Sequence, residues 1–446
     1  MALQTIDSLA RRLRAGEVTA RQLVEECLHT IETRNPQLNA FILVCAETAR
    51  QQADEADRAL RTGADRGPLH GIPISLKDIF DLQGTVTTAA SRVREGIVAS
   101  QDASAVARLR RAGAVIVGKT NLHEFALGTT NEDSAFGPAR NPFDIARSPG
   151  GSSGGSAASV ASGMAIATLG TDTGGSIRIP AAACGIVGLK PGYDELPSDG
   201  VVPLSRTLDH VGPLTTCVTD AWHMLHALRE RAPLKGLTPS PVESLRLGVP
   251  RAYFCDLLDD AVRRSFDAAV ASLRRCGASI VDVEIPHAAL IAPVYVHIVF
   301  GDAAAYHADA LESMPDRYTH NVRLRLEMAR YVTAEDYVRA LEGRRTLRHE
   351  VDAALSGLDA LLLPTLPIVA PRIGEASVAF GERMEPVRNV MLRLTQLFNI
   401  TGHPAISLPM GASADGLPTG LQLAGAFGQT DTLLHIAHGV ELTLGS

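Results

Sequence analysis

Aromatic residues make up only 4% of this 446-residue chain, so large rings cannot supply most of its core. Ala, Val, Leu and Ile must fill the buried volume instead, as is typical of helices packed on a sheet. The hydrophobic share of 46% is sufficient for a large core. The formal net charge is −7, and no block of Lys or Arg is interleaved with aromatics. Nucleic acid and anionic membranes are therefore not expected partners.

Other absences narrow the class of protein further. The six cysteines are widely spaced and form no CxxC pair, which disfavours a zinc site or a disulfide framework. No stretch reaches about 18 consecutive apolar residues, so no membrane span is expected. The first residues, Met-Ala-Leu-Gln-Thr, lack a basic region followed by an apolar run, so no signal peptide is expected. We therefore expect a cytoplasmic protein.

Helical and strand-like segments alternate along the chain. Apolar residues at helical spacing predict helices at about 5–34, 51–62, 103–112, 261–276, across most of 294–355, and at 432–444. Short apolar runs predict strands at 71–78, 114–118, 279–283 and 361–365, of which 114–118 and 361–365 are expected to be buried. Thr19 followed by Gln22 predicts a capping box at the start of the second helix. Because no linker separates domains, this alternation predicts an α/β fold built around one sheet.

Three segments carry residues that are suited to chemistry. They are Pro149–Ser156 and Gly170–Ala181, both rich in Gly and Ser, and the predicted strand that ends at Lys77. Consecutive glycines let backbone amides approach a ligand, and a neighbouring hydroxyl can attack a carbonyl whose oxygen rests on those amides. Such a hydroxyl needs a general base, but the nearest histidine, His123, lies outside these segments. A lysine can serve where burial or positive charge keeps it neutral, and Lys77 ends an apolar strand.

Other interpretations of the same segments stay open at this level. A lysine at a strand end is commonly a surface charge, and a stretch of Gly and Ser is commonly a phosphate-binding turn or a flexible loop. The GxxxxGK[ST] pattern of nucleotide-binding loops is absent. Residues 150–154 match the GxSxG nucleophile elbow. That elbow requires an apolar strand just before it, and residues 143–149 do not provide one.

The run from Gly150 to Arg178, continued to Pro191, resembles the defining stretch of the amidase signature family. Further matching motifs extend over nearly the whole chain, at 71–78, 118–125, 141–142, 208–214, 402–407 and 416–422. The resemblance implies one α/β amidase-signature domain over 1–446, with a central twisted mixed β-sheet covered by helices on both faces. It places the catalytic core at about 65–215 and helical lid and pocket segments at about 290–390.

The resemblance also assigns roles, position by position. The family's triad falls on Lys77 as base, Ser152 as bridging serine after a cis peptide bond, and Ser176 as nucleophile. The implied oxyanion donors are the backbone N–H groups of Thr173, Gly174, Gly175 and Ser176. The implied supports, which orient the loop, are Ser153, Asp172 and Arg178. No metal and no organic cofactor are expected.

One segment departs from the family's usual pattern. After Lys190-Pro191 the chain continues Gly192-Tyr193-Asp194-Glu195, with two acids where a turn glycine and an arginine are usual. This change lies close to the expected catalytic loop. It therefore bears on loop geometry and on substrate access, whereas the triad itself is intact.

The implied function is hydrolysis of a C–N bond in a small amide, anilide or carbamate through an acyl-enzyme. Among family members, the chain is similar in size to stand-alone bacterial amidases of the aryl acylamidase and urethanase kind. An alternative is the glutaminase subunit of a tRNA-dependent amidotransferase. Such subunits are expected to carry an aspartate shortly before the position of Asn399, and Val390–Asn399 contains no acid. A catalytically silent binding protein is disfavoured because the triad is complete.

The substrate pocket is expected to be apolar. We predict that Leu392, Leu394, Leu397 and Phe398 flank it and favour an apolar acyl or aryl group over glutamine. Residues 294–337 and 367–386 are the expected pocket walls and lid. The expected partner is a small-molecule substrate, and the expected assembly is a monomer or a homodimer.

Overall fold

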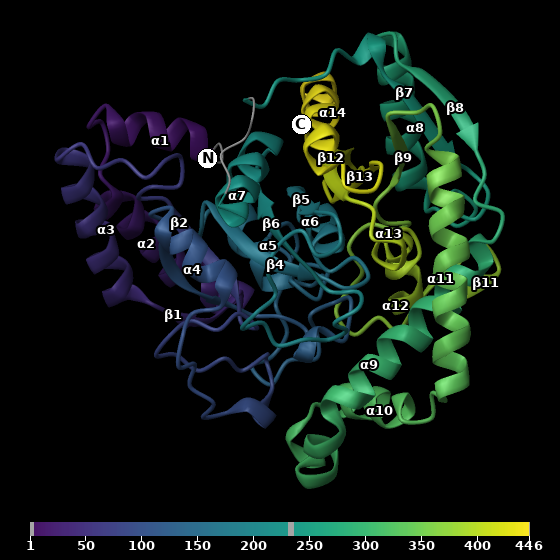
Figure 1. Ribbon diagram of the computed structural model, residues 1–446, viewed down its shortest axis with the longest axis horizontal. Coiled ribbons are helices and arrows are strands. Elements are labelled where there is room, and N and C mark those ends of the chain that lie inside the picture. The colour runs from purple at the N-terminus through teal and green to yellow at the C-terminus, as the bar shows by residue number, and fades with distance from the viewer. Residues whose placement is uncertain (1–3, 231–235, 446) are drawn as a thin grey trace.

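A mixed sheet of 11 strands runs through the molecule in the order β1-β3-β2-β4-β6-β5-β12-β13-β9-β7-β8 (Figure 1). The computed structural model describes residues 4–230 and 236–445. The strands of this sheet are β1 Phe41–Val44, β2 Pro73–Lys77, β3 Val115–Thr120, β4 Ala167–Asp172, β5 Val187–Lys190, β6 His210–Thr215, β7 Arg246–Pro250, β8 Ser279–Val283, β9 Ala360–Pro364, β12 Ala405–Ala412 and β13 Pro418–Ala424. A separate hairpin pairs β10 Ser377–Phe380 with β11 Arg383–Pro386.

Helices flank this sheet and connect its strands. Those of the first half are α1 Ile6–Arg14, α2 Ala20–Leu38, α3 Ala46–Arg61, α4 Ser104–Arg111, α5 Gly154–Ala161, α6 Arg178–Ala183 and α7 Val218–Arg229. Those of the second half are α8 Asp260–Arg275, α9 Ile291–Ser313, α10 His320–Ala329, α11 Ala334–Ala354, α12 Val387–Leu392, α13 Gln396–Thr401 and α14 Thr430–Leu444. The α/β fold around one mixed sheet is therefore confirmed.

Local sequence signals explain several element boundaries. The Thr19 side chain accepts a hydrogen bond from the Gln22 amide and the Gln22 side chain accepts one from the Thr19 amide, so the predicted capping box is present. The strand predicted at 279–283 is β8, and the strand predicted at 71–78 is β2. The last helix, α14, begins two residues earlier than the predicted 432.

Parallel strands bring the three chemical segments to one edge of the sheet. β2 pairs parallel with both β3 and β4, and Leu76 lies opposite Leu169 in the register. Lys77, which ends β2, therefore lies beside the carboxyl end of β4. α5 begins just after Ser152 and Ser153, and α6 begins just after Ser176. Both serine segments thus lie at helix N-termini, where backbone N–H groups lack partners within the helix.

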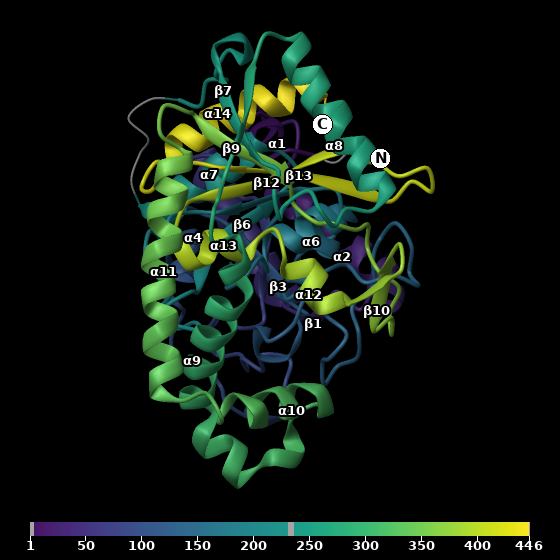
Figure 2. The same cartoon turned by 90° about the vertical axis from the view of Figure 1, so that its right-hand side faces the viewer.

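A layer of long helices stands beside the sheet and projects beyond it. α9, α10 and α11 form this layer, with α10 at its far end (Figure 2). The helical segment Ala288–Ser313 is apolar and long enough to cross a membrane by length and composition alone. However, Ile298, Val299 and Ala303 have no exposed surface, and α9 packs against α10, α11 and α13. We therefore assign α9 to the protein core.

Candidate active site

Lys77 lies at the centre of the candidate site. Its Nζ lies 2.7 Å from the Ser152 hydroxyl oxygen and donates to the Thr171 hydroxyl at 2.9 Å. The Lys77 side chain has no exposed surface. At 2.7 Å a proton can pass directly between Ser152 and an uncharged Nζ.

Burial lowers the pKa of Lys77 to about 7, because desolvation penalises the ammonium form. The nearby carboxylates of Asp209 and Asp172 act in the opposite direction and favour the charged form. Desolvation outweighs them. A neutral lysine can accept a proton, so near neutral pH a large fraction of Lys77 is able to act as a general base.

The two serine segments are joined through the backbone. The Ser153 amide donates to the Ser176 carbonyl at 3.2 Å, and the Gly151–Ser152 peptide bond is cis. Ser152 has no exposed surface, whereas Ser176 keeps 5% of its surface exposed. Of the two serines, Ser176 keeps surface that a substrate entering from solvent can meet, whereas the buried Ser152 contacts Lys77.

The loop before α6 presents free backbone donors. Within the described residues, the N–H groups of Gly174, Gly175 and Ser176 have no hydrogen-bond acceptor. Gly175 has φ of +142°, and a Cβ at this position would lie 2.2 Å from the Thr395 hydroxyl. Only glycine fits there. The loop can thus direct several amides toward one developing negative charge, which is the requirement for an oxyanion hole.

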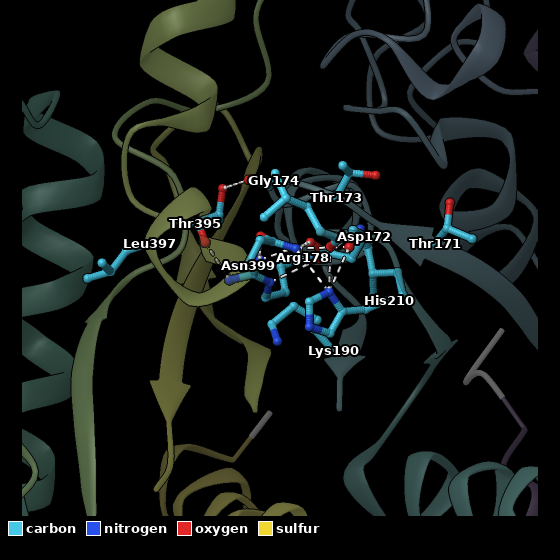
Figure 3. A network of polar contacts seen from close by, with 12 residues as sticks. Thr171, Asp172, Thr173, Gly174, Arg178, Lys190, His210, Thr395, Leu397 and Asn399 are labelled. Atoms are coloured by element: carbon cyan, nitrogen blue, oxygen red, sulfur yellow. Dashed lines mark hydrogen bonds and ion pairs between the residues drawn. The ribbon is translucent and has the colours of Figure 1, made fainter. Parts of the chain in front are cut away.

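A buried ion pair fixes the base of this loop. Arg178 donates to both carboxylate oxygens of Asp172, from Nε at 3.0 Å and from an Nη at 2.9 Å, and neither residue is exposed (Figure 3). Asp172 also accepts from the Ile177 amide at 3.2 Å. The Arg178 guanidinium holds the pKa of the Asp172 carboxyl well below its usual range, although burial alone would raise it. A bidentate pair of this kind restrains the loop geometrically.

Residues from the far end of the sequence complete the support (Figure 3). Asn399 accepts from Arg178 at 2.6 Å and donates to Asp172 at 2.8 Å, and Gln422 accepts from Arg178 at 2.6 Å. The Thr395 hydroxyl donates to the Gly174 carbonyl at 2.6 Å. This last bond anchors the loop through its carbonyl and leaves its N–H groups free.

Sequence reasoning did not assign roles to Thr171, Asp209, Thr395 or Asn399. Asp209 lies in the quoted motif 208–214, and its carboxylate accepts from the Thr173 hydroxyl at 2.6 Å and from the Leu204 amide at 3.0 Å. Burial raises the pKa of Asp209 to about 6. An acid inside a matching motif was an available signal for Asp209. For Thr395 and Asn399, the signal was polar side chains within an otherwise apolar segment.

The predicted supports and the nearest histidine are also placed. The Ser153 hydroxyl donates to the Thr171 carbonyl at 3.2 Å, which ties Ser153 to β4. The His123 amide donates to the Ser152 carbonyl at 3.0 Å, but its ring faces Asp133, with Nε2 at 3.1 Å from the carboxylate. His123 therefore positions the Ser152 backbone, and its ring makes no contact with either serine.

The unusual loop after Pro191 is held by its own acid. The Glu195 carboxylate accepts from the Gly192 amide at 2.7 Å and from the Thr430 hydroxyl, and it forms an ion pair with Arg229. Asp194 adopts a positive φ of +60°. Glu195 thus links this loop to α7 and α14.

The predicted apolar pocket wall is wrong for three of its four residues, Leu394, Leu397 and Phe398. Leu394, Leu397 and Phe398 have no exposed surface, and Leu392 has 6%. Leu397 points away from the Asp172–Arg178 pair (Figure 3). Side chains that no water reaches cannot line an open pocket. These apolar side chains anchor the α12–α13 segment in the core, while Thr395 and Asn399 of the same segment face the site.

The expected pocket segments do reach the site. A Cβ at Gly174 would lie 2.5 Å from the Tyr295 hydroxyl, so α9 meets the loop that bears the free amides. Within 367–386, the Ala370 carbonyl accepts from Arg147 at 2.7 Å and the Pro371 carbonyl accepts from the Ser148 amide at 2.9 Å. Within the described ranges, no group of three or more His, Cys, Asp or Glu side chains is arranged to hold a metal ion.

Comparison with known proteins gives consistent matches over almost the entire chain. The family model described as Amidase matches residues 22–434. An amidase of Pseudomonas putida is 40% identical over 93% of this chain and 90% of its own length. A glutamyl-tRNA(Gln) amidotransferase subunit from Geobacter metallireducens is 38% identical over 98% of this chain and 96% of its own length.

Solved structures give the same result. A crystal structure of an amidase has a TM-score of 0.93 at 38% identity, and the match covers 98% of this chain and 99% of that one. The crystal structure of a glutamyl-tRNA(Gln) amidotransferase subunit from Thermotoga maritima has a TM-score of 0.77 at 32% identity, over 95% of this chain and 91% of its own. The sequence resemblance and the fold agree with both comparisons. The chain therefore belongs to the amidase family of C–N hydrolases.

Proposed function

We propose that this chain is an amidohydrolase in which Ser176 attacks the carbonyl of a small amide, anilide or carbamate. The observation that carries the proposal is the 2.7 Å contact between the buried Lys77 Nζ and the Ser152 hydroxyl, on a loop bonded to the Ser176 backbone. A lysine with a pKa of about 7 can take a proton at neutral pH. Without a base of this kind, a serine hydroxyl is a weak nucleophile.

The proposed reaction has two halves. In the first, Lys77 takes the proton of Ser152, which takes the proton of Ser176, and Ser176 Oγ bonds to the carbonyl carbon. The oxyanion rests on the N–H groups of the 173–176 loop. Ser152 then gives a proton to the leaving amine as its C–N bond breaks, and Lys77 returns a proton to Ser152. In the second half, water repeats the attack on the acyl-enzyme through the same relay, and Ser176 leaves.

A second candidate is the glutaminase subunit of a tRNA-dependent amidotransferase. It is favoured by the similarity of curated relatives that are named as subunits of such an enzyme, for example the one from Geobacter metallireducens at 38% identity. Against it, residues 390–399 contain no acid where such subunits are expected to carry an aspartate. The amidase of Pseudomonas putida, at 40% identity, supports the stand-alone interpretation equally. We therefore propose an amidase that acts on small molecules in the cytoplasm, as a monomer or a homodimer.

A substrate panel separates these candidates. The purified chain is incubated with a p-nitroanilide, with a p-nitrophenyl carbamate and with glutamine, and release of nitroaniline, nitrophenol or ammonia is followed. We expect turnover of the anilide or the carbamate and none of glutamine. Ammonia from glutamine alone would overturn the stand-alone proposal. Absence of any turnover, together with no covalent labelling by a fluorophosphonate, would overturn the catalytic proposal itself.

A further inference from the structure

Arg388 on α12 is a cation without a counter-ion in the described part of the chain. Its Nε is buried and has no hydrogen-bond acceptor, and among the described residues no carboxylate forms an ion pair with it. Its guanidinium faces the Phe300 ring, whose centroid lies 5.9 Å from the guanidinium carbon. The rest of the side chain is half-buried, so part of it stays open to a ligand.

Such a group is costly to keep unpaired, since burying a charge without a partner opposes folding. Burial lowers the pKa of the Arg388 guanidinium, and the neighbouring Arg325 cation acts in the same direction. A cation–π contact at 5.9 Å lies near the limit of that interaction and satisfies no N–H donor. The site around Arg388 therefore has unused positive charge and unused hydrogen-bond donors.

The neighbouring arginines do have partners. Arg325 donates to the Leu127 carbonyl at 3.1 Å and lies 3.6 Å from the Asp133 carboxylate. Arg393 donates to the Tyr253 carbonyl at 2.8 Å. Arg388 differs from both, so its lack of a partner is particular to this position.

Arg388 lies against α9, the helix that also meets the proposed oxyanion loop. The charge of Arg388 interacts electrostatically with the titratable groups of Tyr295 and His123. The Tyr295 hydroxyl meets Gly174 of the free-amide loop, and the His123 amide holds the Ser152 carbonyl. Arg388 and the loop that carries the free amides thus contact the same helix, α9, at Phe300 and Tyr295 respectively. A group held by Arg388 can belong to the same small molecule as the amide that Ser176 attacks.

We propose that Arg388 binds a carboxylate carried by the substrate, away from the carbonyl that is attacked. This inference rests on the proposed function and narrows its preferred substrates to amides that bear a carboxylate and no ammonium group beside it. Glutamine stays disfavoured because its ammonium group would meet the Arg388 and Arg325 cations. A guanidinium matches a carboxylate in shape and charge and can donate two parallel hydrogen bonds to it. The bound substrate thereby supplies the counter-ion that the protein itself does not.

The test compares matched substrates. Hydrolysis of succinamic and glutaramic acids is measured against that of butyramide and valeramide, which replace the carboxylate by a methyl group. We expect kcat/KM to favour the carboxylate-bearing amides about 10- to 100-fold, the range for a lost hydrogen bond to a charged group. In Arg388→Met this ratio should fall toward one, and in Arg388→Lys it should be partly retained because the charge remains.

Arg383→Met is the matched control, because Arg383 lies exposed on the nearby strand β11 and carries no described contact to the site. The control should keep the wild-type ratio. Equal kcat/KM values for charged and neutral amides in the wild type would overturn the proposal. So would a preference that survives in Arg388→Met, since the carboxylate would then be bound elsewhere.

A binding measurement keeps this test separate from the proposed function. Calorimetric titration with glutarate reports on Arg388 even if no amide is hydrolysed, and we expect binding by the wild type that Arg388→Met weakens at least tenfold. Loss of turnover with retained glutarate binding would count against the catalytic proposal only. Turnover without any glutarate binding, and without a substrate preference, would count against the Arg388 proposal only.

Discussion

The position of Lys77 at the end of β2 sets its protonation state. All five residues of this strand are buried, so the amine leaves water when the sheet forms. Its polar contacts are two hydroxyl groups, on Ser152 and Thr171, which accept hydrogen bonds without adding charge. Desolvation without a contacting carboxylate is the combination that makes an amine neutral near pH 7.

The pH dependence of kcat/KM should follow from this state. The pKa of Lys77 is lowered to about 7, so the active neutral form is lost as the pH falls below that value. We expect a rising limb centred near pH 7, with a loss of about tenfold per pH unit below it. In Asp209→Asn a carboxylate that favours the charged lysine is removed, so the limb should move to lower pH by up to about one unit.

The midpoint of the limb is the readout, because partial unfolding of Asp209→Asn reduces the amount of active enzyme and leaves the midpoint unchanged. This matters because Asp209 also accepts from the Leu204 and Ser205 amides. A limb that stays in place in Asp209→Asn would show that the carboxylate does not set the charge of Lys77.

The two serines should respond differently to removal of their hydroxyl groups. Ser176→Ala should abolish the covalent adduct with a fluorophosphonate, detected by intact-mass spectrometry, and reduce kcat by roughly 10⁴-fold or more. Ser152→Ala should also lose turnover but still form the adduct slowly, because the nucleophile is present and only its activation is missing. An adduct that survives in Ser176→Ala would place the nucleophile elsewhere.

Among single residues, Lys77, Ser152 and Ser176 could be predicted as site residues from the family motifs that contain them. Thr171 and Asp209 acquire their contacts only when β2, β4 and the segment before β6 come together. The motifs that contain Thr171 and Asp209 mark these residues but do not indicate the contacts. Arg388 could not be singled out from the sequence either, since its lack of a partner is visible only when every described neighbour is in place.

The segment from α12 to α13 combines two functions in successive residues. Its apolar residue types led to the prediction of an apolar pocket. In the structure, its leucines and Phe398 pack into the core instead. Thr395 and Asn399, four residues apart, both contact the network around Asp172 and Gly174. Spacing of four residues puts side chains on one face of a helical segment. The apolar face is structural, and the polar face supports the loop.

Thr395→Val tests that support. The substitution keeps the side-chain shape and removes the 2.6 Å hydrogen bond to the Gly174 carbonyl, which should loosen the loop that carries the free amides. We expect kcat for a p-nitroanilide to fall about fivefold, with KM little changed, because one hydrogen bond of roughly 1 kcal/mol is lost from loop positioning.

Thr365→Val is the matched control, since it removes a buried hydroxyl contact of 2.8 Å to Ser407 on β12, outside the loop network. Both variants should lose similar free energy of unfolding in urea, and only Thr395→Val should lose kcat. Equal losses of kcat in the two variants would show that Thr395 contributes to the stability of the fold and has no specific role in positioning the loop.

Secondary structure was predictable where the periodicity was clear and much less so in the Gly- and Ser-rich middle. The strands β2, β8 and β9 and the helices α4 and α8 follow apolar patterns. In contrast, β4 and α5 are built mainly from Ala, Gly, Ser and Thr, whose side chains carry little hydrophobic signal. They form because close packing favours small residues; for instance, a Cβ at Gly155 would lie 2.5 Å from the Ala40 carbonyl.

Over the whole molecule, distant parts of one chain assemble the candidate site. Lys77 and the two serines come from the first half, whereas Tyr295, Arg388, Thr395 and Asn399 come from the second. The strand order explains this, because β12 of the second half pairs with β5 of the first. The order of strands in the sheet followed from no local pattern, since it depends on long-range pairing.

Because every group of the proposed relay and its supports belongs to one chain, catalysis should not require a second copy or another protein. We expect the rate per chain, measured with a p-nitroanilide, to stay constant when the protein is diluted through any monomer–dimer equilibrium seen by light scattering. An amidotransferase component would instead depend on its partners. A rate per chain that falls upon dissociation would show that a neighbouring copy completes or stabilises the site, as a homodimer with a shared active site requires.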